Sequence, residues 1–393
     1  MKQLGLIGLW FFLLTFPILG IKVRLSEQKI DLNPHIPLIL SISLLAIFIF
    51  YQKLIKPLLD PHHTKQGLFT AKILNSQEWI RKKHLHFKVI LAIGLVVLPL
   101  LASPYHNTIL ITALMYVVLG LGLNIVVGLA GLLDLGYVAF YAVGAYTYAL
   151  LNMHYGLGFW LVLPIAGVLA AIAGILLGIP VLRLRGDYLA IVTLGFGEII
   201  HVVLETWSEF TEGPKGIYSI PKPGLFGIKL GYIQSNIYLY YLIVIMVLIT
   251  IMVVHRLIYS RIGRAWVALR EDELACELMG INTTKVKLTA FGLGATWAGF
   301  IGAFFAAKNS FVNPASFTFH QSALILCIVI LGGLGSIAGV ILAATILILL
   351  PEYFRFLEQY RMLFFGLSMV LVMVFKPEGL IKKPSSDYSK LKY

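Results

Sequence analysis

Three polar side chains stand in stretches whose neighbours are almost all apolar. Asn124 opens a Gly-rich stretch, Asp134 lies in Gly-Leu-Leu-Asp-Leu-Gly, and Glu198 lies in Gly-Phe-Gly-Glu-Ile-Ile-His. Ionisable groups in such surroundings are costly to bury, so they often mark a path for a substrate or a proton. The plainer interpretation is a charge at a helix end or break, or, for Asn124, a hydrogen bond to a neighbouring helix. We take Asn124, Asp134 and Glu198 as substrate-pathway candidates.

Charges of both signs gather in the segment 264–281, between two long apolar runs. The members that stand out are Arg270, Glu271, Asp272 and Glu273, with Leu274, Leu278 and Met279 at helical spacing. Gly280 follows these residues, and a glycine in the left-handed backbone conformation often ends a helix. The pattern predicts one amphipathic helix that docks onto a partner protein, with a solvated loop helix as the alternative.

Several common catalytic motifs are missing from the sequence. It has no Gly-x-x-x-x-Gly-Lys-Ser/Thr loop, no His-Glu-x-x-His and no Gly-x-Ser-x-Gly. If ATP is used, another polypeptide must bind it. The pairs His62-His63 and His84-x-His86 lack nearby cysteines or carboxylates that would complete a metal site. We therefore expect no catalytic residues, no bound metal and no cofactor.

The composition is that of a membrane protein. Of 393 residues, 59% are hydrophobic and only 12% are charged, where a soluble domain carries about a quarter charged residues. Two cysteines, Cys276 and Cys327, argue against a disulfide scaffold. The net charge of +13 fits the cytoplasmic excess of Lys and Arg in membrane proteins, so we expect no nucleic-acid partner.

Apolar runs of membrane-spanning length recur along the whole chain. The predicted spans are 4–21, 36–54, 88–103, 108–128, 132–151, 159–182, 188–206, 238–258, 286–307, 318–335, 337–354 and 360–377. Several are short or Gly-rich and could be re-entrant or broken helices. The prediction is an all-α polytopic protein of about ten to twelve membrane helices.

Lys and Arg set the predicted orientation. They concentrate in the 52–88 and 256–287 loops and after residue 376, which places both termini in the cytoplasm. No small-x-small cleavage site follows the first span, so we expect it to remain as an uncleaved helix.

The predicted organisation has three parts. Residues 1–86 form an N-terminal extension with two spans and a basic cytoplasmic loop, which could contact anionic lipid. Residues 87–380 form the membrane core, including the cytoplasmic segment 260–285, and residues 381–393 form a cytoplasmic tail.

Two Gly-rich stretches of the core, 124–131 and 327–339, resemble each other. Internal repeats are common in transporter folds, with the substrate near the repeat interface. The pairs Gly174/Gly178 and Gly335/Gly339 have the four-residue spacing of close helix contacts.

A series of motifs, in order along residues 108–380, resembles the permeases of branched-chain amino acid ABC importers. It comprises the stretch from Gly120 to Tyr146, Leu-Arg-Leu-Arg-Gly-Asp-Tyr from Leu182, Thr-Glu-Gly-Pro-Lys-Gly-Ile from Thr211, the segment 261–281, Ile-Leu-Gly-Gly-Leu-Gly-Ser-Ile-Ala-Gly from Ile330 and Phe-Lys-Pro-Glu-Gly-Leu from Phe375. The long N-terminal extension and the Arg-Leu-Arg-Gly-Asp-Tyr element resemble the M-type subunit.

The resemblance implies a type II ABC importer permease-like fold and a division of labour. An H-type permease would form a heterodimer with the chain, two ATPase subunits would hydrolyse ATP at the cytoplasmic face, and a periplasmic or extracellular binding protein would deliver leucine, isoleucine or valine. The chain itself would be a multi-pass protein of the bacterial inner membrane and no enzyme. Arg270, Glu271, Asp272, Glu273 and Gly280 would then belong to the ATPase-coupling helix.

One departure and two alternatives remain. The general importer pattern has Glu-Ala-Ala with Gly three residues later, whereas here Leu274-Ala-Cys stands there and Glu273 comes one place earlier. A urea or short-amide importer permease would look similar, because the binding protein sets much of the selectivity. A proton-coupled carrier would instead use Glu198 and His201. A membrane enzyme is disfavoured because no catalytic constellation is recognisable.

Overall fold

The computed structural model describes residues 21–24, 29–32 and 103–353, with gaps at 183, 185 and 225–230, and isolated positions elsewhere. The chain divides into two units, Met1–Val89 and Ile90–Tyr393. In the first, β1 (Ile21–Arg24) pairs antiparallel with β2 (Lys29–Leu32). The predicted span 36–54 and both histidine pairs lie outside the described residues, as do nearly all of the spans 4–21, 88–103 and 360–377 and of the tail 381–393. The three-part division stays a prediction.

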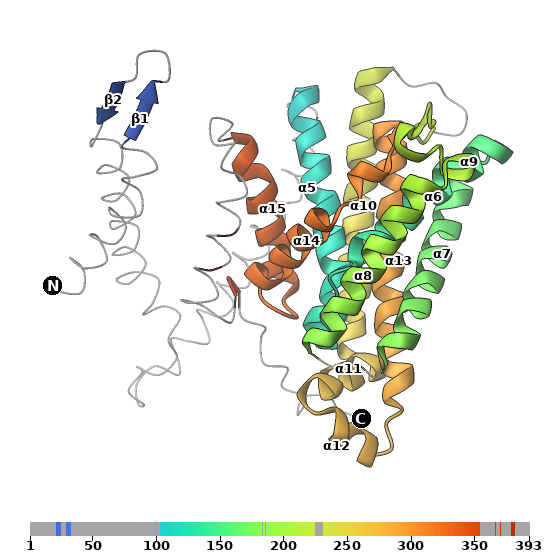
Figure 1. The fold of residues 1–393 in the computed structure, drawn as a ribbon, viewed down its shortest axis with the longest axis vertical. Helices are drawn as coiled ribbons and strands as arrows, with labels where there is room; N and C mark the ends of the chain where they lie inside the picture. The colour runs from blue at the N-terminus through green and yellow to red at the C-terminus, as the bar shows by residue number, and fades with distance from the viewer. Residues whose placement is uncertain are drawn as a thin grey trace, which may run out of the picture. The chain divides into compact units, whose positions relative to one another are not determined.

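The second unit is a helical bundle (Figure 1). Its longer helices are α5 (Pro104–Leu123), α6 (Tyr137–Tyr155), α7 (Phe159–Val181), α8 (Asp187–Thr206), α10 (Tyr232–Tyr259), α11 (Arg261–Glu271), α13 (Thr283–Asn309), α14 (Phe319–Gly332) and α15 (Ile337–Tyr353). The shorter elements are η2 (Asn124–Leu129), α9 (Ser208–Thr211), η3 (Gly213–Lys215), α12 (Glu273–Leu278), η4 (Pro314–Ser316) and the strand pair β3 (Ile217–Tyr218) and β4 (Phe311–Val312).

Six helical stretches of the described residues are long and apolar enough to cross a membrane. They are Pro104–Leu129, Phe159–Val181, Asp187–Thr206, Ile233–Tyr259, Thr283–Asn309 and Pro314–Gly332, with a shorter apolar helix at Ile337–Leu349. The fold is therefore the expected all-α polytopic one, and each predicted span from 108–128 to 337–354 overlaps a helix. The total of ten to twelve spans stays a prediction, because four of them fall largely outside the described residues.

Glycines let α13 lie at the centre of the bundle, packed closely by α6 and α7. A Cβ added at Gly144 of α6 would lie 2.2 Å from the carbonyl oxygen of Gly299, and one at Gly174 of α7 would lie 2.7 Å from Ala295 Cβ. Small residues allow such backbone approach where the hydrophobic effect does not drive helices together. The close contact predicted from the Gly174/Gly178 spacing is thus confirmed.

Two chain breaks meet inside the bundle. The first is the π-helix η2 and the loop after it, where Gly131 has φ +72°. The second joins α14 to α15, where Gly333 and Gly335 also have positive φ. The Asn124 Oδ1 accepts a hydrogen bond of 2.8 Å from the Gly335 backbone N–H. The two Gly-rich stretches that resemble each other in sequence are therefore in direct contact.

Candidate functional site

The polar segment, residues 260–285, contains two helices where one was predicted. The helix breaks at Asp272, whose backbone is extended (φ −156°, ψ 111°), so α11 ends at Glu271 and α12 begins at Glu273. The Asp272 side chain accepts a 3.0 Å hydrogen bond from Ala275 N–H, the usual role of Asp at a helix N-cap. The prediction of a single helix was wrong because a capping side chain and a helix-compatible charge run look alike in sequence. Figure 1 shows both helices at one end of the bundle.

Buried apolar residues fix α11 to the core. Trp266 is fully buried, and its indole N–H donates a 3.0 Å hydrogen bond to the Val286 carbonyl of α13. Leu269, three residues further along the same face of α11, is also buried. Ser260 caps the helix by accepting from the Gly263 N–H. α11 is thus a rigid arm of the membrane core.

Arg270 ties the end of α11 to the first chain break. Its Nη1 donates a 2.7 Å hydrogen bond to the Gly128 carbonyl oxygen of η2. Gly131, with φ +72°, lies against the same side chain, and a Cβ there would come within 2.7 Å of Arg270 Cγ. A π-helical turn leaves backbone groups outside the ordinary helix ladder, and here the guanidinium satisfies one of them.

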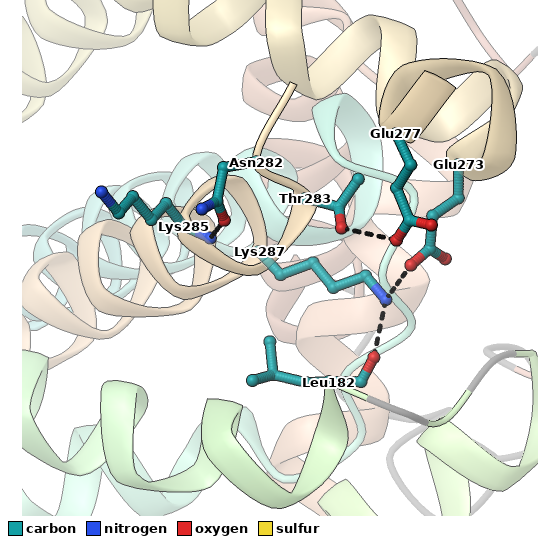
Figure 2. A network of polar contacts seen from close by, with 7 residues as sticks. All are labelled: Leu182, Glu273, Glu277, Asn282, Thr283, Lys285 and Lys287. Carbon is teal, nitrogen blue, oxygen red and sulfur yellow. Dashed lines mark hydrogen bonds and ion pairs between the residues drawn. The ribbon is translucent and has the colours of Figure 1, made fainter. Parts of the chain in front are cut away.

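A second tie runs from α12 to α13 and the end of α7 (Figure 2). Lys287 Nζ lies 2.7 Å from Glu273 Oε1, and the two side chains are only 3% and 17% exposed. The same ammonium donates to the Leu182 carbonyl at 3.0 Å. Beside them, Thr283 donates a 3.0 Å hydrogen bond to Glu277. Removing one partner of such a pair would leave an uncompensated buried charge. The pair therefore holds α12 in its position against α13.

A cavity of about 340 Å³ separates these ties. It is lined by Ala130, Gly131, Leu132, Leu184, Gly186, Leu189, Leu269, Arg270, Glu271, Asp272, Glu273 and Lys287. Around this pocket, discrete polar contacts add to the apolar packing that holds α11 to the core.

The outward side of α12 is apolar. Leu274, Leu278 and Met279 are 59%, 80% and 81% exposed. Gly280, with φ +78°, follows the C-cap of α12, as predicted from its position. By contrast Cys276 is buried, and burial together with the nearby Asp272 and Glu273 carboxylates raises the pKa of its thiol. Leu274, Leu278 and Met279 thus form an exposed apolar tip next to the buried Cys276.

The five residues predicted for ATPase coupling thus fall into two groups. Arg270, Asp272 and Glu273 each have an internal partner that shapes the segment. Glu271 is exposed and Gly280 ends the tip. The sequence interpretation missed Lys287 and Trp266. Lys287 stands close to Lys285 in the polar stretch before a long apolar run, so the sequence did not mark it as the partner of a particular carboxylate.

The three pathway candidates do not share one surface. Asn124, the first residue of η2, and Asp134, in the loop after η2, are fully buried, whereas Glu198 is exposed on α8. One Asp134 oxygen accepts a 2.9 Å hydrogen bond from Gly136 N–H, and its other oxygen has no partner among the described residues. The next residues of that loop are held by Thr193 of α8, which accepts from the Leu135 N–H at 3.0 Å.

Comparisons with known proteins agree on one family. Residues 105–373 match the family model described as the branched-chain amino acid transport system permease component. The chain is 44% identical over 396 residues to the high-affinity branched-chain amino acid transport system permease protein LivM of Escherichia coli K12, covering 94% of this chain and 92% of that protein. The LivM protein of Salmonella typhimurium is 43% identical over 394 residues, with the same coverage.

A shorter similarity links the chain to another permease type. The high-affinity branched-chain amino acid transport system permease protein LivH of Escherichia coli K12 is 31% identical over 132 residues, which is 33% of this chain and 42% of that protein. No solved structure gives a significant match to the chain.

Proposed function

The chain belongs to the permease family of branched-chain amino acid ABC transporters, as a multi-pass membrane subunit, and from this we propose that its polar segment couples it to separate ATPase subunits. It is a transport subunit and not an enzyme. We also propose which residues contact the ATPases, which partners complete the transporter and which residues face the substrate.

The exposed apolar tip of α12 is the observation that carries the coupling proposal. Leu278 and Met279 are about four-fifths exposed on a segment that is otherwise rich in charge. Clustered apolar side chains on an aqueous surface commonly mark a protein interface. We assign this tip to a groove on the ATPase, with Glu271 at its edge and Gly280 permitting the turn back into α13.

The two internal ties give the coupling a route into the membrane. A displacement of α12 would be transmitted to α13 and to the end of α7 through Lys287. Through the adjoining end of α11, it would also be transmitted to η2 by the hydrogen bond from Arg270 to Gly128. η2 in turn contacts the second break through Asn124 and Gly335. ATP-driven movement of the tip would therefore reach the two breaks, where a helix bundle changes shape most easily, and support alternating access.

We further propose the remaining partners and the orientation. The LivH similarity supports an H-type permease as the second membrane subunit, and two ATPases with an external binding protein would complete the importer. The end that carries the polar segment is assigned to the cytoplasm, with both termini, because Arg256, Arg261, Arg264 and Arg270 gather there. The membrane is the bacterial inner membrane and the substrates are leucine, isoleucine and valine.

Asn124, Asp134 and Glu198 remain the proposed pathway residues. Asp134 offers a buried carboxylate oxygen without a partner in the described chain, which suits the ammonium group of an amino acid. Asn124 stands where the two breaks meet. Glu198 is exposed on α8.

The test is leucine uptake in cells that lack the chain and then re-express it with its native partners, with a protonophore added while ATP stays high. Uptake that requires the chain and survives the protonophore supports the proposal, and uptake that disappears with the proton gradient contradicts it. The coupling assignment is tested by Leu278→Asp with Met279→Asp. We expect normal membrane levels but loss of uptake and of co-purifying ATPase, whereas Leu278→Met should behave as the parent does.

A further inference from the structure

The pocket between the polar segment and the membrane core has an apolar floor. Its volume of about 340 Å³ lies within the range of pockets that hold small molecules. Its apolar lining is buried or half-buried and comes from the loop after η2, the connection from α7 to α8, α8 itself and α11. These residues are Ala130, Leu132, Leu184, Leu189 and Leu269. An apolar group of a ligand would therefore be removed from water here.

The rim of the same pocket is charged and reaches water. Arg270, Glu271 and Asp272 line the pocket and are exposed. Glu273 and Lys287 line it too, but they pair with each other at 2.7 Å, and Figure 2 shows the Lys287 ammonium pointing to Glu273. Because that pair is neutral as a whole, the remaining rim offers a ligand one cation and two carboxylates.

Arg270 and Glu271 keep hydrogen-bonding capacity for a ligand. A guanidinium has five N–H donors, and the hydrogen bond that joins Arg270 to another described residue is the one to the Gly128 carbonyl. The Glu271 carboxylate forms no hydrogen bond or ion pair within the described part of the chain. A guanidinium binds a carboxylate through two parallel hydrogen bonds, and a carboxylate accepts from an ammonium. The rim therefore has one group for each charge of a zwitterion.

This combination of floor and rim matches an α-amino acid with an apolar side chain. Inorganic phosphate would gain nothing from the apolar floor, and the carboxylates of Glu271 and Asp272 would repel it. The charged residues of the rim do not form a cluster that could hold a metal ion, and no such cluster occurs among the described residues. Leucine, isoleucine and valine, the proposed substrates, have the required zwitterion and an apolar side chain of suitable size.

We propose that this pocket is a regulatory site that binds a branched-chain amino acid from the cytoplasm, with its carboxylate at Arg270, its ammonium at Glu271 and its side chain on the apolar floor. The inference rests on the proposed function, which assigns this end of the bundle to the cytoplasm and the polar segment to the ATPases. The ligand contacts both the polar segment and the core, so it favours the described arrangement over one in which the segment has moved. Amino acid that accumulates in the cytoplasm would then slow ATP hydrolysis and further uptake.

The experiment uses the assembled transporter in liposomes, with the ATPase subunits facing the outside solution. Leucine-loaded binding protein is sealed inside, and leucine is titrated outside while ATP hydrolysis is measured. We expect hydrolysis to fall as outside leucine rises. Two analogues test the need for both charges, since 4-methylpentanoate lacks the ammonium and isoamylamine lacks the carboxylate. Half-inhibition should take at least about tenfold more of either analogue, because each loses a hydrogen bond between charged groups.

A pair of variants locates the effect in the pocket. Leu184→Trp places a larger side chain in the lining from a half-buried position. Leu257→Trp is the matched control, because Leu257 is also half-buried against the core, lies near the polar segment on α10 and does not line the pocket. The rate of each variant is compared with its own rate without outside leucine. We expect Leu184→Trp to lose the inhibition and Leu257→Trp to keep it.

Four results would overturn the inference: no inhibition by outside leucine, equal inhibition by leucine and either analogue, equal inhibition by inorganic phosphate, or inhibition that a folded Leu184→Trp variant retains. The analogue series uses the parent chain, so it decides the question even if Leu184→Trp does not fold. Leucine uptake in cells keeps the two proposals separate. If the parent takes up leucine but outside leucine leaves hydrolysis unchanged, only the regulatory site is wrong. If the parent takes up no leucine but shows the inhibition, and Leu184→Trp does not, only the proposed substrate is wrong.

Discussion

Lys287 Nζ lies 2.7 Å from Glu273 Oε1, which joins the polar segment to the helix at the centre of the bundle. The two residues are close in sequence, but they belong to different helices with a sharp turn at Gly280 between them. Because the Leu182 carbonyl accepts from the same ammonium, three parts of the chain meet at one buried cation.

Breaking this pair should be costly, and removing both charges together should not. Glu273→Leu leaves the Lys287 charge buried, and we expect a loss of stability of about 3 kcal/mol. The double variant Glu273→Leu with Lys287→Met should recover most of it. Thermal unfolding of the purified transporter measures both. Equal stability of the single variant and the parent would show that the pair contributes nothing.

Arg270→Gln removes the charged donor from the Gly128 carbonyl. We expect a loss of about 1 kcal/mol and a larger relative fall in leucine uptake, because the tie to η2 would carry the coupling movement. Arg256→Gln, at an exposed arginine near the same end of the bundle, is the control and should leave membrane levels and uptake unchanged. Uptake is normalised to the amount of chain in the membrane. Normal uptake by Arg270→Gln would argue against this route.

Glycine substitutions should differ sharply with position. Gly144→Ala places a Cβ 2.2 Å from the Gly299 carbonyl oxygen, and the separation of α6 from α13 that this forces should cost about 1–3 kcal/mol. The Cβ of Gly195→Ala meets no atom of the described residues within 4 Å. In the isolated subunit we expect a lower thermal midpoint for the first variant and little change for the second. A similar midpoint for both would contradict the described packing of α6 on α13.

Thiol labelling should report on the α12 tip. Since burial and the Asp272 and Glu273 carboxylates raise the pKa of Cys276, little thiolate is present at neutral pH and maleimide should react slowly, faster as the pH rises. Leu278→Cys, at an 80% exposed position, should react rapidly in a variant that also carries Cys276→Ser and Cys327→Ser. Addition of the ATPase subunits should protect it. Labelling unaffected by the ATPases would remove Leu278 from the interface.

Local pattern alone identified the class and most of the described architecture. The membrane composition, the spans from 108–128 to 337–354 and the end of the polar segment at Gly280 follow from hydropathy and from the conformational freedom of glycine. These properties depend on a residue and its near neighbours, so a sequence reports them directly. The motif series led to the same family that the comparisons show.

The tertiary structure decided which partners the polar side chains find. The break at Asp272, the pairing of Glu273 with Lys287, the contact of Arg270 with Gly128 and that of Asn124 with Gly335 all depend on how helices far apart in the chain pack. The exposed position of Glu198 on α8 likewise depends on how the helices pack. Hydropathy predicts that a helix is buried in a membrane, but only packing determines which of its faces meets lipid and which awaits another protein.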